Sequence, residues 1–236
     1  MAGRETGAPG VEPDAALPTL EEIAARAAAE RLAILGGFAT APDEPHLPAG
    51  TAALLLIGPA TGFWPHLTGA PEWQDGAPDP VDRWSRRVIG RLACDLGAKA
   101  LFPFGGPPWH PFQSWALRTG RVWESPVRLL VHEDQGLWVS FRGALALKRA
   151  VPLPPPPAAA PCTDCAGQPC RTACPAGALV PAGYDLDRCH GYLDTLAGAD
   201  CMGQGCAVRR ACPVSRGYDR MPGQSAYHMA QFHRRG

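Results

Sequence analysis

The sequence predicts an α+β protein in two parts, an α/β-type first domain followed by a small cysteine-rich domain. Patterns typical of helices and strands alternate as far as residue 148, and eight of the nine cysteines lie between positions 162 and 212. Four consecutive prolines at 154–157 separate the two regions. We therefore expect a disordered segment over 1–17, a first domain over 18–150, a linker over 151–161 and a second domain over 162–236.

Composition excludes several classes of partner. The 236 residues carry 22 basic and 22 acidic side chains, so there is no net positive charge to attract nucleic acid. No apolar run approaches the ~18 residues that a membrane-spanning helix needs. The first residues form no apolar segment typical of a secretory signal. We expect a soluble, cytoplasmic protein with neither a nucleic-acid nor a membrane partner.

Two helices are predicted in the first domain. Thr19-Leu-Glu-Glu22 has the pattern of a capping box, and the helix that it starts is expected to run to about Leu35, before Gly36-Gly37. Asp79 and Pro80 predict a second helix, with Asp79 as its N-cap. Apolar residues follow at helical spacing and indicate a buried face that we expect to include the lone Cys94: Trp84, Val88, Ile89, Leu92 and Leu96.

Strands are predicted between and after these helices. The apolar segments 51–57 and 100–104 read as strands, and 127–132 with 136–147 as a hairpin connected by Glu133-Asp134-Gln135. The loop at 105–114 fits no regular element. Gly143 inside the second hairpin strand indicates a close approach of backbone, and Arg142 beside it is expected at a solvated edge.

The cysteines form two groups, each of which ends in Cys-Pro. The first is Cys162-x2-Cys165-x4-Cys170-x3-Cys174-Pro175, and the second is Cys189-x11-Cys201-x4-Cys206-x5-Cys212-Pro213. In ferredoxins with two [4Fe-4S] clusters, the cysteine before proline binds the other group's cluster. A ferredoxin-like domain is therefore predicted, with one cluster on Cys162, Cys165, Cys170 and Cys212, and the other on Cys174, Cys189, Cys201 and Cys206.

Two other roles for these cysteines are weighed against the clusters. Four-thiolate zinc sites also use C-x2-C, but they usually contain two short pairs, and this chain has only one. Disulfides belong mainly to secreted proteins, and no secretory signal is seen. Zinc and disulfides remain the alternatives.

The cysteine region resembles the iron–sulfur module of epoxyqueuosine reductases. The matching features are the first cysteine group, the Cys189-His-Gly-Tyr192-Leu193 segment, and Gly136-Leu-Trp138-Val-Ser-Phe-Arg142-Gly143 before a proline-rich linker. The first domain also resembles the cobalamin-processing decyanases, which are related to flavin nitroreductases, through Asp79-Pro80-Val81-Asp82 and residues 132–143. Together the resemblances span roughly residues 50–213 and imply a nitroreductase-like first domain with a corrinoid (cobalamin) site. An Asp-Tyr-His segment like the one at the reductases' active site is missing from this sequence.

Four side chains of the first domain are predicted to contact such a cofactor. The aromatic loop at 105–115 could cover a flat macrocycle, or it could pack as a compact surface loop. The histidine before the turn at 133–137 could lie at the cofactor, or it could cap a hairpin. The predicted cofactor-binding residues are His132, Trp109, Trp115 and Trp138.

The predicted function is that of an iron–sulfur electron-transfer protein that passes electrons to an acceptor at the first domain. Residues 209–236 contain six arginines and a single acid, Asp219, so this segment could dock an acidic electron-donor protein or simply be a solvated tail. The alternatives are a corrinoid-dependent reductase and a cobalamin-binding protein whose clusters reduce the bound cobalamin. Catalytic residues are not predicted.

Overall fold

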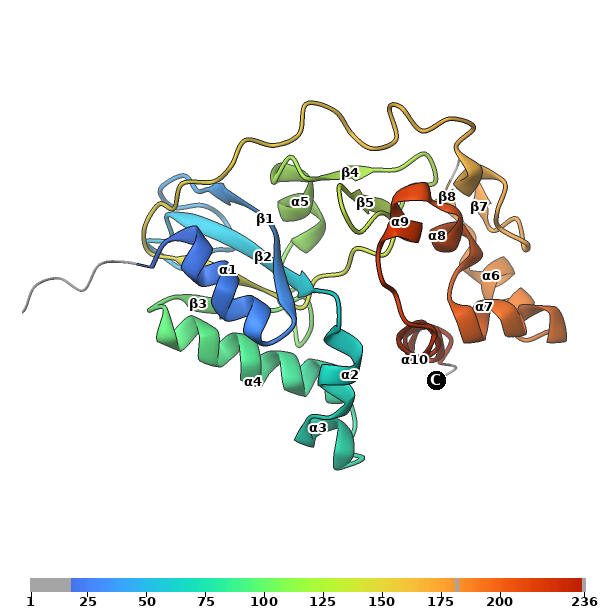
Figure 1. Cartoon of the computed structure of the whole chain (residues 1–236), viewed down its shortest axis with the longest axis horizontal. Coiled ribbons are helices and arrows are strands. Elements are labelled where there is room, and N and C mark those ends of the chain that lie inside the picture. The colour runs from blue at the N-terminus through green and yellow to red at the C-terminus, as the bar shows by residue number, and fades with distance from the viewer. Residues whose placement is uncertain (1–17, 181–182, 235–236) are drawn as a thin grey trace, which may run out of the picture.

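A four-stranded antiparallel sheet forms the centre of the first domain (Figure 1). The computed structural model describes residues 18–180 and 183–234, so the predicted disorder of 1–17 lies outside the described residues. The strand order is β1 (Leu32–Ala39), β2 (Ala53–Pro59), β6 (Gly143–Leu147) and β3 (Lys99–Leu101). The protein is thus α+β, as predicted.

Both faces of the sheet are covered, which explains why β2 is buried along its whole length. Leu55 and Ile57 point into a core beneath α1 (Leu20–Ala29) and α4 (Pro80–Asp95). Leu54 and Leu56 point into a second core, which also contains residues of α5 (Phe112–Arg118) and of the small ribbon β4 (Val122–Glu124) and β5 (Leu130–His132). The alternation is that of a central strand between two layers.

The first predicted helix is shorter than expected. Its capping box is present: the Glu22 amide donates to Thr19 Oγ1 over 3.2 Å, and the Thr19 amide to Glu22 Oε2 over 2.7 Å. The helix ends at Ala29, Arg31 adopts a left-handed φ of 55°, and the chain turns back as β1. The extension to Leu35 was therefore wrong, and Gly36 forms a bulge in β1 at φ 130°.

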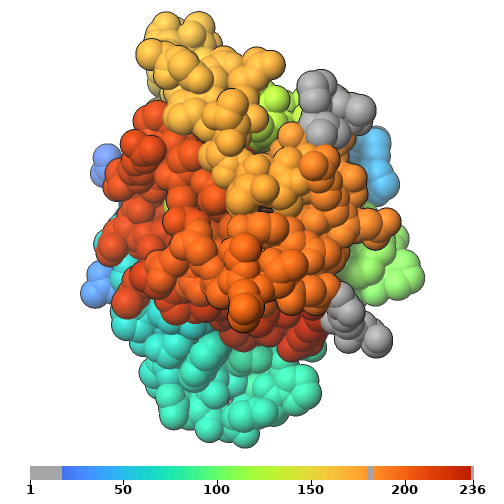
Figure 2. All heavy atoms as spheres, turned by 90° about the vertical axis from the view of Figure 1, so that its right-hand side faces the viewer, coloured from blue at the N-terminus to red at the C-terminus, as the bar shows by residue number. Residues whose placement is uncertain are grey.

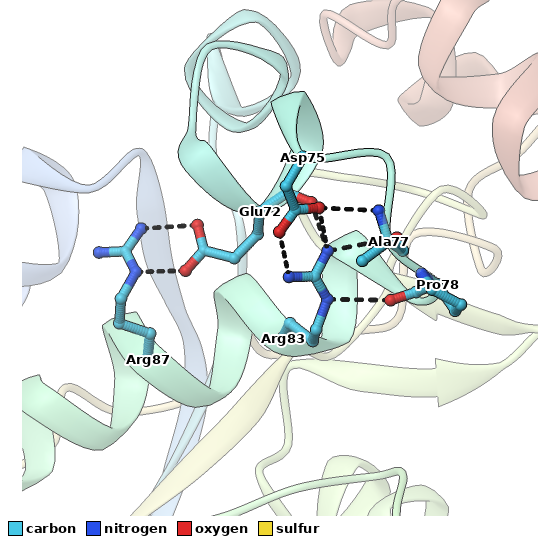
Figure 3. A network of polar contacts seen from close by, with 6 residues as sticks. All are labelled: Glu72, Asp75, Ala77, Pro78, Arg83 and Arg87. Atoms are coloured by element: carbon cyan, nitrogen blue, oxygen red, sulfur yellow. Dashed lines mark hydrogen bonds and ion pairs between the residues drawn. The ribbon is translucent and has the colours of Figure 1, made fainter.

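The second predicted helix is α4, and the expected apolar positions face the first core. Cys94 is exposed, so its predicted burial was wrong. A network of arginines fixes α3 (Pro71–Gln74) against α4 (Figure 3). Arg83 donates to both oxygens of Asp75 over 2.8 and 2.7 Å, and Arg87 pairs with Glu72. The preceding helix α2 (Phe63–Thr68) leads into this corner.

Of the predicted hairpin between 127–132 and 136–147 only the turn is present: His132 and Gly136 form an antiparallel bridge, but the two strands do not pair with each other. β5 pairs with β4, whereas β6 lies between β2 and β3. Residues 136–139 continue the turn, since the amide of Trp138 donates to Gln135 O over 3.0 Å. A Cβ on Gly143 would lie 3.1 Å from the Leu101 carbonyl oxygen, which confirms the close approach of backbone. Arg142 is half-buried beside Asp82 rather than at a solvated edge.

After β6 the chain runs as an extended segment along the first domain to the cysteine-rich region (Figure 1). This region is built of short elements: η1 (Pro169–Arg171), β7 (Leu179–Val180), β8 (Gly183–Tyr184), α6 (Leu186–Leu193), η2 (Leu196–Gly198), α7 (Ala199–Gln204), α8 (Ala207–Ala211), α9 (Pro213–Gly217) and α10 (Pro222–Phe232). Figure 2 shows that residues after 160 cover most of one face of the molecule, with the α2–α3 segment below them.

The two regions share a third core, which unites side chains from both sides of the linker. Val131 and Leu137 of the first region pack with Val208 of α8. The Leu137 amide donates to Ser215 Oγ over 2.8 Å. Gly136 has φ 55°, and a Cβ there would lie 2.4 Å from the Ser215 amide nitrogen, so glycine is required for the contact.

Candidate metal centre

Four cysteines surround a first cavity of about 330 Å³: Cys162, Cys165, Cys170 and Cys212. The loop that carries the first three turns sharply, because Gly167 and Gln168 both adopt left-handed conformations. Cys212 enters from the other cysteine group, at the N-cap of α9, where its backbone is extended. These are the four cysteines that the spacing assigned to one cluster.

The other four cysteines surround a second cavity of about 280 Å³: Cys174, Cys189, Cys201 and Cys206. Cys189 lies on α6, Cys201 on α7 and Cys206 at the N-cap of α8. Cys174 belongs to the first cysteine group in the sequence, where it precedes Pro175, but it lies in the second cavity. The five-residue helix α8 joins Cys206 of this set to Cys212 of the other, so the two sets adjoin.

The spacing of the sulfur atoms bears on what the sets could hold. All nine cysteines are free. Among the described residues, no three cysteine sulfurs lie within 4.8 Å of one another. Sulfurs that bind one zinc ion lie about 3.8 Å apart, since each Zn–S bond measures about 2.3 Å in a tetrahedral site. The described sulfurs are therefore spaced more widely than those of a formed zinc site.

The surroundings of the cysteines favour the neutral thiol over the thiolate. Burial, and to a lesser degree the neighbouring cysteines, raise the pKa of Cys162, Cys170 and Cys189. Four adjacent thiolates are thus unfavourable unless positively charged metal lies between them. Two donors already point to sulfur in the second set: the Ala178 amide to Cys174 over 3.3 Å, and the Tyr184 hydroxyl to Cys189 over 3.1 Å.

Of the four predicted cofactor-binding residues of the first domain, only Trp138 lines one of the two cysteine cavities. Trp138 lines the second cavity, but Trp109 is 63 % exposed and lines neither cavity. Trp115 is buried in the second core of the sheet. The structure therefore does not assemble the loop at 105–115 and the turn at 132–138 into one cofactor-binding face.

His132 caps a turn, which was the alternative reading of this residue. It is 3 % exposed, and its Nδ1 atom accepts hydrogen bonds from the amides of Asp134 over 3.1 Å and Gln135 over 3.3 Å. Burial lowers the pKa of the imidazole. Although His132, Glu133 and Asp134 cluster closely enough to suggest a metal site, Glu133 is paired with Arg121 and Nδ1 is occupied by the two amides.

Sequence reasoning missed a group of basic side chains in the second cavity. Arg142, Arg209, Arg220 and His228 all line it, although the last three belong to the segment that was expected as a docking surface or a solvated tail. The buried residues of α10 are the polar Gln224 and Ser225, so hydrophobic spacing gave no signal that this segment packs on the protein. Apolar contacts hold it there, for Tyr227 lies 5.6 Å from Trp64 and 5.1 Å from Trp73 between ring centroids.

No family model matches the chain, and neither a curated protein nor a solved structure shows significant similarity to it. Among the described residues, no helix is both long and apolar enough to cross a membrane. The argument for function therefore depends on the two cysteine sets and their surroundings.

Proposed function

We propose that this protein transfers electrons and holds two [4Fe-4S] clusters, one in each cysteine set. The observation that carries the proposal is the arrangement of eight cysteines around two adjoining cavities, with Cys174 and Cys212 exchanged between the groups. When bound, such clusters would supply one-electron chemistry at potentials set by charge, burial and hydrogen bonds to sulfur.

The chain's own residues would hold and tune these groups. The Ala178 amide and the Tyr184 hydroxyl donate toward sulfurs of the second set, and donors of this kind stabilise electron-rich sulfur. Arg209 lies near Cys206, where its positive charge would stabilise the negative charge of a thiolate. Arg171 lies near Cys170 of the first set, but the described lining of the first cavity contains Asp164 and no arginine, whereas three arginines line the second. We therefore infer that the second set is the better electron acceptor of the two.

The corrinoid alternatives have less support from the geometry. A cobalamin bound across the loop at 105–115 would need Trp109, Trp115 and His132 on one exposed surface, but Trp115 and His132 are both buried. Adding hydroxocobalamin to the purified protein and measuring retention by gel filtration tests this: co-elution would support a corrinoid-dependent reductase or a cobalamin-binding protein.

Metal analysis tests the proposed function directly. Protein reconstituted under anaerobic conditions should contain about eight iron and eight sulfide ions per chain. Cys94→Ser is the matched control, because Cys94 is exposed on α4 outside both sets, and it should leave the iron content unchanged. Zinc at about one or two ions per chain with negligible iron would contradict the proposal.

A further inference from the structure

The second cavity extends beyond its cysteines to a wall formed by both regions of the chain. Trp138 and Arg142 come from the segment before β6, and Arg220 and His228 come from the C-terminal segment. Arg220 lies over the Trp138 ring, with its guanidinium carbon 5.0 Å from the centroid. Gly205 allows this packing, since a Cβ there would lie 2.8 Å from the Trp138 ring.

The arginines of this wall have few anionic partners. Arg142 donates to Asp82 over 3.2 Å. Arg220 donates to the Ser225 hydroxyl over 3.1 Å, and within the described part of the chain it forms no ion pair. Burial lowers the pKa of Arg220 to about 10, so it stays charged near neutral pH, at a cost that an anion beside it would offset.

His228 marks the point where these charges converge. Burial, followed by the charges of Arg220, Arg142 and Arg209, lowers the pKa of His228 to about 3, so the ring is neutral at physiological pH. Its ring nitrogens form no hydrogen bond within residues 18–180 and 183–234. A neutral imidazole can donate one hydrogen bond to a ligand held by the arginines.

The arginines of the cavity differ in the charged groups that lie near them. Arg209 is the arginine on which a cysteine, Cys206, acts. Arg142 is partly engaged by Asp82, so Arg220 is the guanidinium of this wall that has no ion pair among the described residues.

We propose that this wall of the second cavity binds a small organic molecule through an oxyanion group, a carboxylate or a phosphate, held by Arg142 and Arg220. Guanidinium groups bind both oxyanions through paired hydrogen bonds. Apolar side chains complete the cavity and fit an apolar body on the ligand: Val139, Leu193, Met229 and Phe232. The inference rests on the proposed function only in placing the ligand beside a cluster.

Calorimetry with simple aromatic probes tests the site. Benzoate and phenyl phosphate should bind the anaerobically reconstituted protein, and the neutral analogue benzamide should bind at least about tenfold more weakly. The stronger of the two anions identifies the oxyanion. Arg220→Gln should weaken anion binding by about tenfold or more, whereas Arg216→Gln, at an exposed arginine outside the cavity, should not change it.

Iron analysis of the same samples separates the two proposals. Eight iron ions without anion binding up to about 10 mM would overturn the anion site alone. Equal binding of benzamide, or an equal loss in Arg216→Gln, would overturn it too. Anion binding that depends on Arg220 in protein without iron would support the site and contradict the clusters. If Arg220→Gln fails to fold, Arg220→Lys keeps the charge and should still weaken binding, because it loses the paired geometry.

Discussion

His132 shows how a residue that attracts attention in a sequence can have a structural role. The imidazole is buried, and its Nδ1 atom accepts two backbone hydrogen bonds in the turn that leads to Leu137. Leu137 in turn contacts Ser215 and Arg209 of the cysteine-rich region. The neutral ring thus shapes the turn on which the two regions meet.

Two replacements of His132 should separate the contribution of its hydrogen bonds to stability from that of its protonation. His132→Ala leaves two amides without an acceptor and should destabilise the protein by about 1–3 kcal/mol. In His132→Asn, the amide oxygen can accept from the same amides, so the loss should be smaller. Melting temperatures of both variants, measured under anaerobic conditions, check these expectations. Equal losses of stability in the two variants would show that the hydrogen bonds to His132 do not stabilise the fold.

The same variants should differ from the wild type in their response to pH. Folding lowers the pKa of His132, so below about pH 6.5 the unfolded chain binds more protons at this residue than the folded chain. The wild type should therefore lose stability as the pH falls from about 6.5, and His132→Asn should lose less. A wild type and variant with parallel pH curves would contradict a neutral, buried His132.

At the level of single residues, the cysteines could be predicted from the sequence and the basic cavity wall could not. A fixed spacing limits which sulfurs can converge, so Cys174 and Cys212 could be assigned before the structure was known. The position of Arg220 opposite Trp138 depends on the return of α10 to the first region, and local spacing contains no information on that contact.

The elements of the first domain were predictable where local chemistry decides them. Thr19 and Glu22 form a capping box through contacts between near neighbours, and α4 has an apolar face against the sheet. Strand pairing depends on distant residues instead. The segment 143–147 was correctly predicted as a strand, but its partners are β2 and β3, which come from far earlier in the chain.

At the same scale, α8 makes the exchange of cysteines testable. It carries Cys206 at its start and leads to Cys212, so the two sets are joined by one short helix. Cys174→Ser should perturb the cluster of the second set and largely spare the first, and Cys212→Ser should do the reverse. Electron paramagnetic resonance of the reduced protein distinguishes the clusters of the two sets. Loss of the cluster held by Cys162 and Cys165 in Cys174→Ser would disprove the assignment.

Across the whole molecule, stability is distributed unevenly between the two regions. The two cores on either side of the sheet contain no residue between 162 and 217. The third core includes Cys170 and Cys212 among its buried members, and Val208 is the one buried aliphatic residue that the cysteine-rich region contributes to it. If the thiolates hold the proposed clusters, the cysteine-rich region should depend on them for stability, whereas the sheet should not.

Removal of the metal should therefore unfold one region locally. In the iron-free protein, amide hydrogen exchange should increase across 162–217 and around Val131 and Leu137, while β1, β2 and β6 keep their protection. Mass spectrometry of proteolytic fragments measures this by segment. A uniform increase that includes the sheet would show that the first region also depends on metal.

The packing of α10 on the first region limits how the cysteine-rich region can move. The cysteine-rich region is attached to the first region at both ends, through the proline-rich segment and through the Tyr227 contacts with Trp64 and Trp73 (Figure 1). A domain on a single tether can swing between a donor and an acceptor, as a mobile arm. This region is held at both ends, so it should move together with the first region, and the face seen in Figure 2 should keep its shape.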